Sequence, residues 1–163
     1  MQLTFINASP RGRNSNTAIL MNHFLQGVKE TPGNTITVEW LIDYRDNLEP
    51  LVEKFCAAEN VWLGFPLYID AMPAAVKAFM EALAPCAGRR DLPALGFMIQ
   101  CGFPETAHLR FLARYCQKFS RRLGVQPLGM ILKGGCEGLA IQPSFLTEKY
   151  FTLFSMLGRH FGQ

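Results

Sequence analysis

The sequence has no long apolar run and little charge. No apolar stretch approaches the ~18 residues that cross a membrane, and the N-terminus lacks the basic and apolar segments of a signal peptide. We therefore expect a cytoplasmic protein with no membrane partner. Charged residues make up 18% of the 163, and the formal net charge is +3. The neighbouring arginines at 89–90 and 121–122 are not interleaved with aromatic residues, which disfavours nucleic-acid binding.

Cysteine is present without a recognisable ligand pattern. The five cysteines form no Cys-x-x-Cys pair and are Cys56, Cys86, Cys101, Cys116 and Cys136. This spacing excludes the usual zinc and iron–sulfur motifs, and the odd number argues against a disulfide framework. We expect most of them to be small buried apolar residues and expect no metal. The sequence also lacks a Walker A motif and a three-glycine dinucleotide fingerprint, which disfavours nucleoside triphosphate hydrolysis.

The most informative stretch covers residues 3–17. Leu3 to Ile6 form a short apolar run that predicts a strand, Gly12 lies in the break that follows, and a helix begins at Asn16. The connecting loop is rich in hydroxyl, amide and arginine side chains. It ends at a helix N-terminus, where free N–H groups and the helix dipole favour an anion. A phosphate-binding loop fits this pattern, but ordinary N-capping by Ser15 or Asn14 fits it equally well.

Apolar periodicity predicts five strands that alternate with five helices. The expected strands are Leu3–Ile6, Thr35–Leu41, Val61–Phe65, Ala94–Ile99 and Leu128–Leu132. The expected helices start near Asn16, Pro50, Ala74, Glu105 and Pro143, and the last three end near Leu83, Leu123 and Arg159. Continuously apolar strands separated by helices indicate a parallel sheet covered on both faces. We predict a single α/β domain over residues 1–163, a three-layer sandwich with a five-stranded sheet in the flavodoxin-like order 2-1-3-4-5.

The loops after the first, third, fourth and fifth strands share one edge of such a sheet, where ligands bind. The loop from Pro66 to Pro73 holds Tyr68, whose flat ring suits a planar ligand. A hinge loop with Tyr68 packed on the core is the alternative. The loops Gln100–Glu105 and Lys133–Gly138 contain glycines, which let backbone amides approach a ligand closely and which also make turns.

These segments resemble those of the flavodoxin-like NAD(P)H-dependent FMN reductases, in the same order and over nearly the whole chain. The similar motifs are Ser9-Pro10-Arg11 with Ser15-Asn16-Thr17, Pro66-Leu67-Tyr68 leading to Met72-Pro73 and Lys77-Ala78-Phe79, Gly102-Phe103-Pro104-Glu105 with His108, and Gly134-Gly135 with Glu137. Some relatives carry cysteines for an iron–sulfur cluster between the second strand and the next helix. Residues 42–50 contain no cysteine, so no cluster is expected.

The resemblance implies FMN as the cofactor and NAD(P)H as the hydride donor. By similarity, the FMN phosphate is held by Ser9, Arg11, Ser15, Asn16 and Thr17. The isoalloxazine ring is flanked by Pro66, Leu67, Tyr68 and Ile69, with Gly102 and Phe103 on the neighbouring loop. Arg13 adds a second cation to the phosphate loop. The electrons then pass to a small-molecule acceptor such as a quinone, a flavin or a nitro compound, and no catalytic residue is expected.

Two other functions stay open. A flavodoxin-type electron carrier is disfavoured by the net charge of +3, because such carriers are usually acidic. A relative that keeps the fold without flavin, and serves as a scaffold, is the other alternative, because fold alone does not determine function.

The expected last helix carries more apolar residues than one sheet face needs, namely Phe145, Leu146, Tyr150, Phe151, Leu153, Phe154, Leu157 and Phe161. This excess predicts a homodimer, and a well-buried terminal helix is the alternative. The expected fourth and fifth strands are neighbours, so Cys101 and Cys136 could face each other either as a redox-active pair or as two inert thiols.

Overall fold

The computed structural model describes residues 1–163 and contains one sheet of five parallel strands, in the order β2-β1-β3-β4-β5. The strands are β1 (Gln2–Asn7), β2 (Thr35–Trp40), β3 (Asn60–Pro66), β4 (Ala94–Gln100) and β5 (Pro127–Lys133). In the central pairing, Phe5 of β1 lies opposite Val38 on one side and Trp62 on the other. The predicted strand order is confirmed.

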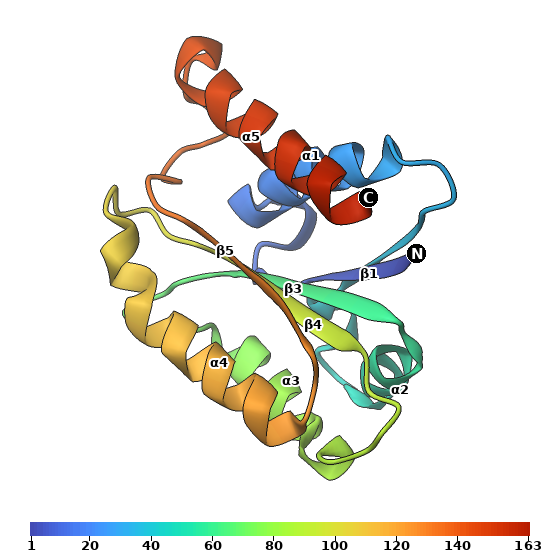
Figure 1. The fold of residues 1–163 in the computed structure, drawn as a ribbon. Coiled ribbons are helices and arrows are strands. Elements are labelled where there is room, and N and C mark those ends of the chain that lie inside the picture. Colours follow the sequence, from blue (N-terminus) through green and yellow to red (C-terminus); the bar gives the residue numbers. More distant parts are fainter.

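Five helices cover the sheet in two layers. Helices α1 (Asn16–Lys29) and α5 (Ser144–Gly162) lie on one face, and α2 (Glu49–Ala57), α3 (Ala74–Ala82) and α4 (Arg110–Leu123) lie on the other (Figure 1). The three-layer α/β sandwich predicted from the apolar pattern is therefore confirmed. None of the helices combines the length and the apolar character that a membrane crossing requires.

The core consists of two apolar clusters, one on each face of the sheet. Because successive strand residues point to opposite faces, Phe5 packs against α1 and α5 whereas Ile6 packs against the other helices. On β3, Trp62 likewise belongs to the cluster under α1 and α5, and Leu63 belongs to the cluster on the opposite face. Alternation between two covered faces explains why these strands are apolar throughout.

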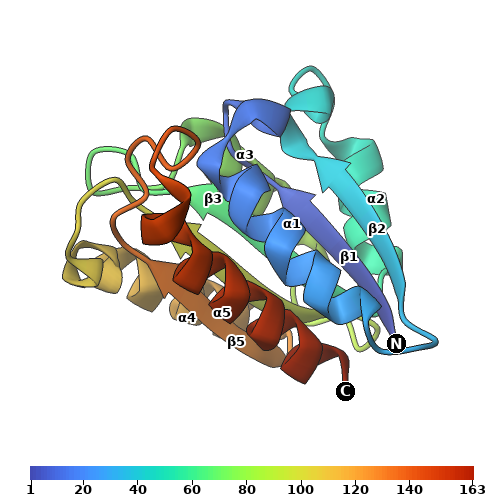
Figure 2. The ribbon, with the colours of Figure 1, turned by 90° about the horizontal axis from the view of Figure 1, so that it is seen from above.

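Two glycines bring α1 and α5 into close contact. A Cβ atom on Gly27 would lie 1.8 Å from the carbonyl oxygen of Ser155, and one on Gly158 would lie 1.9 Å from that of Phe24. No side chain fits at either position, so the two backbones pack directly against each other. Figure 2 shows the two helices side by side.

The segment after β4 differs from the prediction of one helix starting near Glu105. The backbone of Glu105 is extended, a short 3-10 helix follows at Thr106–Leu109, and α4 begins only at Arg110. The fully buried side chain of Leu109 anchors this turn in the core. As a result, residues 101–105 form a longer loop at the carboxyl end of β4. The last helix also extends three residues beyond the expected end, to Gly162.

The two ends of the sheet differ in character. Both chain termini lie at one end, and the loops that follow β3, β4 and β5 gather at the other (Figure 2). The carboxyl ends of the parallel strands lie at this second end, which is where an open α/β sheet binds ligands.

Candidate functional site

A cleft of about 760 Å³ opens among the loops that follow β1, β3, β4 and β5. Its volume lies within the range of about 300 to 1,000 Å³ that is typical of small-molecule sites. Ten of the eleven predicted site residues line it, namely Ser9, Arg11, Ser15, Asn16, Pro66, Leu67, Tyr68, Ile69, Gly102 and Phe103. The fold thus brings together segments that are almost 100 residues apart in the sequence.

Thr17 is the eleventh predicted residue, and its side chain is fully buried behind the cleft. Its Oγ1 accepts a hydrogen bond of 3.4 Å from Nε2 of Gln100, and Gln100 itself lines the cleft. The side chain of Thr17 therefore supports the site through Gln100 rather than facing the cavity.

Backbone hydrogen bonds hold the loops around the cleft in place. The parallel hydrogen-bond ladder continues one residue beyond the ends of three strands. The N–H groups of Ala8, Leu67 and Cys101 donate to the carbonyl groups of Gly64, Gln100 and Lys133, with N···O distances of 2.7, 2.7 and 3.0 Å. The residues at the start of each loop are consequently held as firmly as the strands that precede them. A site built on such loops is largely formed before a ligand arrives.

The loops after β4 and β5 also contact each other. The N–H of Gly135 donates to the carbonyl of Phe103 at 2.6 Å, and a Cβ on Gly134 would lie 2.6 Å from the carbonyl oxygen of Pro104. Asn16, the first residue of α1, donates from Nδ2 to the carbonyl of Cys136 at 2.5 Å. These contacts connect the start of α1 with both loops.

One end of the cleft contains hydrogen-bond donors that the chain itself does not use. Ser9 and Ser15 are each only 2% exposed, and their Oγ atoms accept N–H bonds from Arg11 and Ala18 at 3.4 and 3.0 Å. Neither hydroxyl proton has an acceptor within the chain, so both can be donated to a ligand. The N–H groups in the first turn of α1 precede the first intrahelical bonds, and Arg11 forms no ion pair. Donors, helix dipole and cation together favour an anion.

The interpretation of Ser15 as an N-cap is confirmed, and its interpretation as a phosphate ligand stays a prediction. Ser15 is the N-cap of α1, with its side chain bonded to Ala18. Capping uses the oxygen of the hydroxyl and leaves its proton free, so the same residue can cap the helix and contact a ligand.

The prediction that Arg13 adds a second cation to this loop is wrong. Its guanidinium forms two hydrogen bonds with Asp43, of 3.2 and 2.8 Å, and stacks over the ring of Trp40 at 4.9 Å. The hydrogen bond raises the pKa of Arg13 and lowers the pKa of Asp43. Arg13 does not line the cleft, which leaves Arg11 as the cation there.

Aromatic and apolar side chains form the other end of the cleft. Tyr68 is 44% exposed, so the alternative in which its ring packs on the core is wrong. Phe103 is 55% exposed, and its ring lies 4.5 Å from that of His108. Exposed rings beside a cavity are suited to contact with a flat ligand.

A strained turn lies between these rings and the third helix. Residues Tyr68 and Ala71 exchange two backbone hydrogen bonds of 2.8 and 3.1 Å, and between them Ile69 and Asp70 have φ angles of +46° and +62°. Both conformations are left-handed, which is costly for the β-branched Ile69. Ile69 is also 97% exposed. Strain of this kind is often found at functional sites.

Six residues of the cleft were not predicted, namely Gln100, Pro104, Glu137, Gly138, Ala140 and Ile141. The first four lie in loops that were predicted at this edge of the sheet, but none of them was predicted as a ligand. Glu137 lies where a Cβ on Gly102 would approach its Oε2 to 2.6 Å, so glycine leaves room for this carboxylate. The position of Ile141 depends on the path of the chain after β5, which local sequence does not specify.

Cys101 and Cys136 lie beside the cleft and are joined through the backbone, with Cys136 N–H donating to Cys101 carbonyl at 2.9 Å. Each sulfur contacts a carbonyl oxygen, that of Phe103 at 3.5 Å and that of Lys133 at 3.7 Å. Burial raises the pKa of both thiols, that of Cys136 to about 11.

No three His, Cys, Asp or Glu side chains gather closely enough to bind a metal ion.

Comparison with known proteins identifies the family. A family model described as "Flavodoxin-like fold" matches residues 1–84, just over half of the chain. The chain belongs to the flavodoxin-like family. The sequence matches no curated protein.

Several solved structures share the flavodoxin-like fold over nearly the whole chain. An NADH:FMN oxidoreductase in its apo form has 21% identity and a TM-score of 0.63, with 98% of this chain and 88% of that chain covered. An NADPH-quinone reductase from P. pentosaceus has 18% identity, a TM-score of 0.67, and coverage of 97% and 98%. An NAD(P)H:quinone oxidoreductase from Methanothermobacter marburgensis has 19% identity, a TM-score of 0.68, and coverage of 99% and 97%. At such identities the likeness establishes the fold.

Proposed function

We propose that this flavodoxin-like protein binds FMN in the cleft and acts as an NAD(P)H-dependent oxidoreductase. The observation that supports this best is the pair of nearly buried serines, Ser9 and Ser15, whose hydroxyl protons have no acceptor in the chain. Each hydroxyl oxygen already accepts one hydrogen bond, and its proton is the donor that the chain leaves for a ligand. Beside Arg11 and the start of α1, that ligand is an anion, and a phosphate fits best.

The rest of the cleft fits the other parts of FMN. Pro66, Leu67 and Tyr68 provide apolar surface and one flat ring, and Gly102 has no side chain, which leaves room for the carboxylate of Glu137. The distribution of polar groups at one end and aromatic groups at the other corresponds to a phosphate joined to a planar ring system. We assign the phosphate to Ser9, Arg11, Ser15 and the first turn of α1, and the ring to the loops after β3 and β4.

Bound FMN supplies hydride chemistry between NAD(P)H and a second acceptor. The chain's own residues provide the position and the surroundings. Ser9 and Ser15 orient the phosphate end by donating hydrogen bonds, Arg11 balances its charge, and Tyr68 and Phe103 limit the access of water to the ring. We assign no proton transfer to any side chain. Three solved structures of the same fold are named for NADH:FMN or NAD(P)H:quinone oxidoreduction, which supports this class of reaction.

The mouth of the cleft favours an apolar, planar electron acceptor. Ile69 and Ile141 are 97% and 88% exposed, and both line the cleft together with Phe103. Exposed apolar groups around a cavity usually mark a binding surface. A quinone, a flavin or a nitroaromatic compound matches this surface better than a charged acceptor does.

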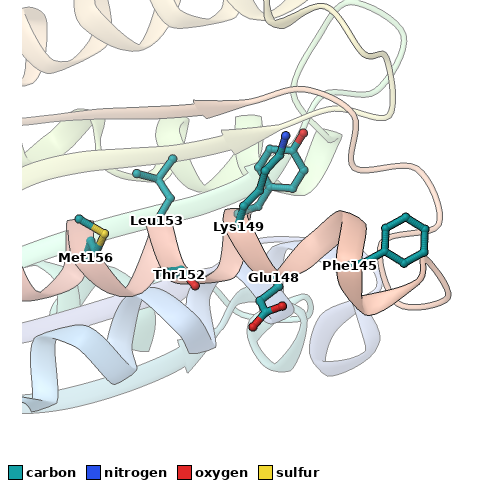
Figure 3. A pocket seen from close by; sticks show the side chains of 7 residues that line it. Phe145, Glu148, Lys149, Thr152, Leu153 and Met156 are labelled. Atoms are coloured by element: carbon teal, nitrogen blue, oxygen red, sulfur yellow. The ribbon is translucent and has the colours of Figure 1, made fainter.

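The outer face of α5 supports a homodimer as part of the proposal. Phe145, Leu153 and Met156 are exposed along one side of this helix and line a shallow pocket of about 610 Å³ (Figure 3). Sedimentation of the wild type and of a Leu153→Glu variant tests this, because the charge should shift a dimer toward monomer. Identical monomeric sedimentation of both would contradict the dimer.

The function is tested by the visible absorption spectrum of the purified protein, recorded before and after FMN is added and then after anaerobic NADPH or NADH. The proposal predicts that flavin binds and that NAD(P)H bleaches it. Bound flavin that neither nucleotide reduces would favour an electron carrier. Failure to bind flavin would remove the proposed function and favour a flavin-free scaffold.

A further inference from the structure

Two cysteines meet at the edge of the sheet opposite the cleft. Cys56 lies in the last turn of α2, and Cys86 ends the short 3-10 helix Ala84–Cys86 that follows α3. Their Sγ atoms are 3.2 Å apart, although the residues are 30 positions apart in the sequence. The rings of Phe55 on α2 and Phe79 on α3 pack edge to face with centroids 6.1 Å apart, so these two helices are in contact.

We propose that Cys56 and Cys86 are a redox modification site, which a low-molecular-weight disulfide converts into a reversible intramolecular disulfide. This inference is independent of the proposed flavin chemistry. All five cysteines are free thiols in the structure.

The reaction is two successive thiol–disulfide exchanges. The Cys56 thiolate attacks one sulfur of the small disulfide, whose other sulfur leaves as a thiolate, and a mixed disulfide forms on Cys56. The Cys86 thiolate then attacks Sγ of Cys56 and displaces the second small thiolate. The two small thiolates take up the two protons that the protein thiols lose. Two protein thiols are thereby oxidised, and one small disulfide is reduced to two thiols.

Exposure determines the order of the two steps. Cys56 is partly exposed and can meet a solute, whereas Cys86 is buried and can reach only its neighbour. Burial, the hydrogen bond with Cys86 and the nearby Asp91 raise the pKa of Cys56 to about 11, and the guanidinium of Arg89 opposes this. Because the thiolate is the attacking species, oxidation should accelerate as the pH rises from 7 to 9.

The surrounding backbone can accommodate the bond. A disulfide requires about 2.05 Å between the sulfurs, so they must approach each other by about 1 Å. Both cysteines lie at the ends of their helices, where Ala58 is already extended and Gly88 has a φ of +81° with open space around it. Movement at these ends leaves the sheet undisturbed.

The other three cysteines do not offer this geometry. Cys101 and Cys136 direct their sulfurs toward carbonyl oxygens, and Cys116 is fully buried on α4. The pair predicted from the strand order, Cys101 and Cys136, lies beside the cleft, and its two sulfurs contact carbonyl oxygens instead of each other. The pair whose sulfurs touch is Cys56–Cys86.

The test is incubation of the native protein with oxidised glutathione at pH 8.5, followed by an acid quench, denaturation, alkylation and peptide mass mapping. We expect two of the five thiols to resist alkylation, a Cys56–Cys86 cross-linked peptide, and full reversal by dithiothreitol. Because the bond closes a loop of about 30 residues, the Tm should rise by about 5 to 10 °C. Flavin affinity should be unchanged, since the pair lies at the opposite end of the sheet.

Two variants sharpen the result. Cys86→Ser should stop the reaction after its first step and leave a stable glutathione adduct on Cys56, and Cys101→Ser should form the cross-link like the wild type. The proposal is overturned if all five wild-type thiols remain alkylatable, or if the cross-link joins a different pair. Mapping of the wild type decides this even if a variant fails to fold.

Discussion

Replacement of Arg11 by alanine should weaken FMN binding, whereas replacement of Arg13 in the same loop should not. Arg11 lines the cleft and forms no ion pair within the chain, so its charge is available to a phosphate. The Arg13 guanidinium is already engaged by Asp43 and by the ring of Trp40, outside the cleft. The two variants therefore remove the same charge from the chain but only one removes it from the site.

The size of the effect follows from the exposure of Arg11. A charge-assisted hydrogen bond to phosphate contributes more than a neutral one, but Arg11 is exposed and its contact is screened by water and salt. A loss of about 1 to 2 kcal/mol is reasonable, which corresponds to FMN binding that is roughly 5- to 30-fold weaker. The loss should shrink as the salt concentration rises.

The assay is titration of FMN fluorescence quenching with wild type, Arg11→Ala and Arg13→Ala, each with its urea denaturation curve. Unchanged denaturation midpoints for Arg11→Ala show that only binding is affected. Equal affinities of all three proteins, or a larger loss for Arg13→Ala, would refute the placement of the phosphate.

Three further predictions concern stability, each measured by urea denaturation. Gly158→Ala should destabilise the protein by about 2 kcal/mol or more, because the new Cβ would lie 1.9 Å from the carbonyl oxygen of Phe24. The control Thr152→Ala, on the exposed side of α5, should change the stability by no more than about 0.5 kcal/mol. An unchanged stability of Gly158→Ala would contradict the close helix contact. Ile69→Asn should stabilise by about 1 kcal/mol, since asparagine tolerates the left-handed conformation and the exposed isoleucine loses no packing; a destabilised variant would argue against the strained turn. Burial raises the pKa of Glu39, but hydrogen bonds from Lys54 and Tyr44 outweigh this and hold it below the usual value. These hydrogen bonds therefore stabilise the folded state at neutral pH, and the contribution is lost as the pH falls below the ordinary carboxyl pKa of 4.5. Glu39→Gln should cost about 1 kcal/mol at pH 7 and progressively less as the solution becomes more acidic; a difference that is independent of pH would contradict this.

Most of the fold could be predicted because its signals are local. The apolar runs at Leu3–Ile6 and Val61–Phe65 identify buried parallel strands, and the helices between them restrict the sheet to a few topologies. The late start of α4 could not be predicted, because the extended backbone at Glu105 depends on how Leu109 enters the core. Helical periodicity continues through that segment and hides the break.

The site was predictable as far as it follows from the ends of strands. The first residues of each edge loop inherit their positions from the sheet, which is why Ser9, Pro66 and Gly102 are found together. Side-chain contacts between residues far apart in the sequence were not predictable. Arg13 turns away because Asp43, 30 residues further along the chain, binds it, and Cys56 meets Cys86 through the packing of α2 against the segment after α3.

Comparison of FMN with riboflavin tests whether the cleft holds FMN by its phosphate. Riboflavin has the same ring system without the phosphate, so it lacks the group that Ser9, Ser15 and Arg11 are proposed to bind. Equilibrium titration of the wild-type protein should show FMN binding about 100-fold more tightly than riboflavin, or better still. Equal affinities for the two flavins, or no binding of FMN, would contradict the account.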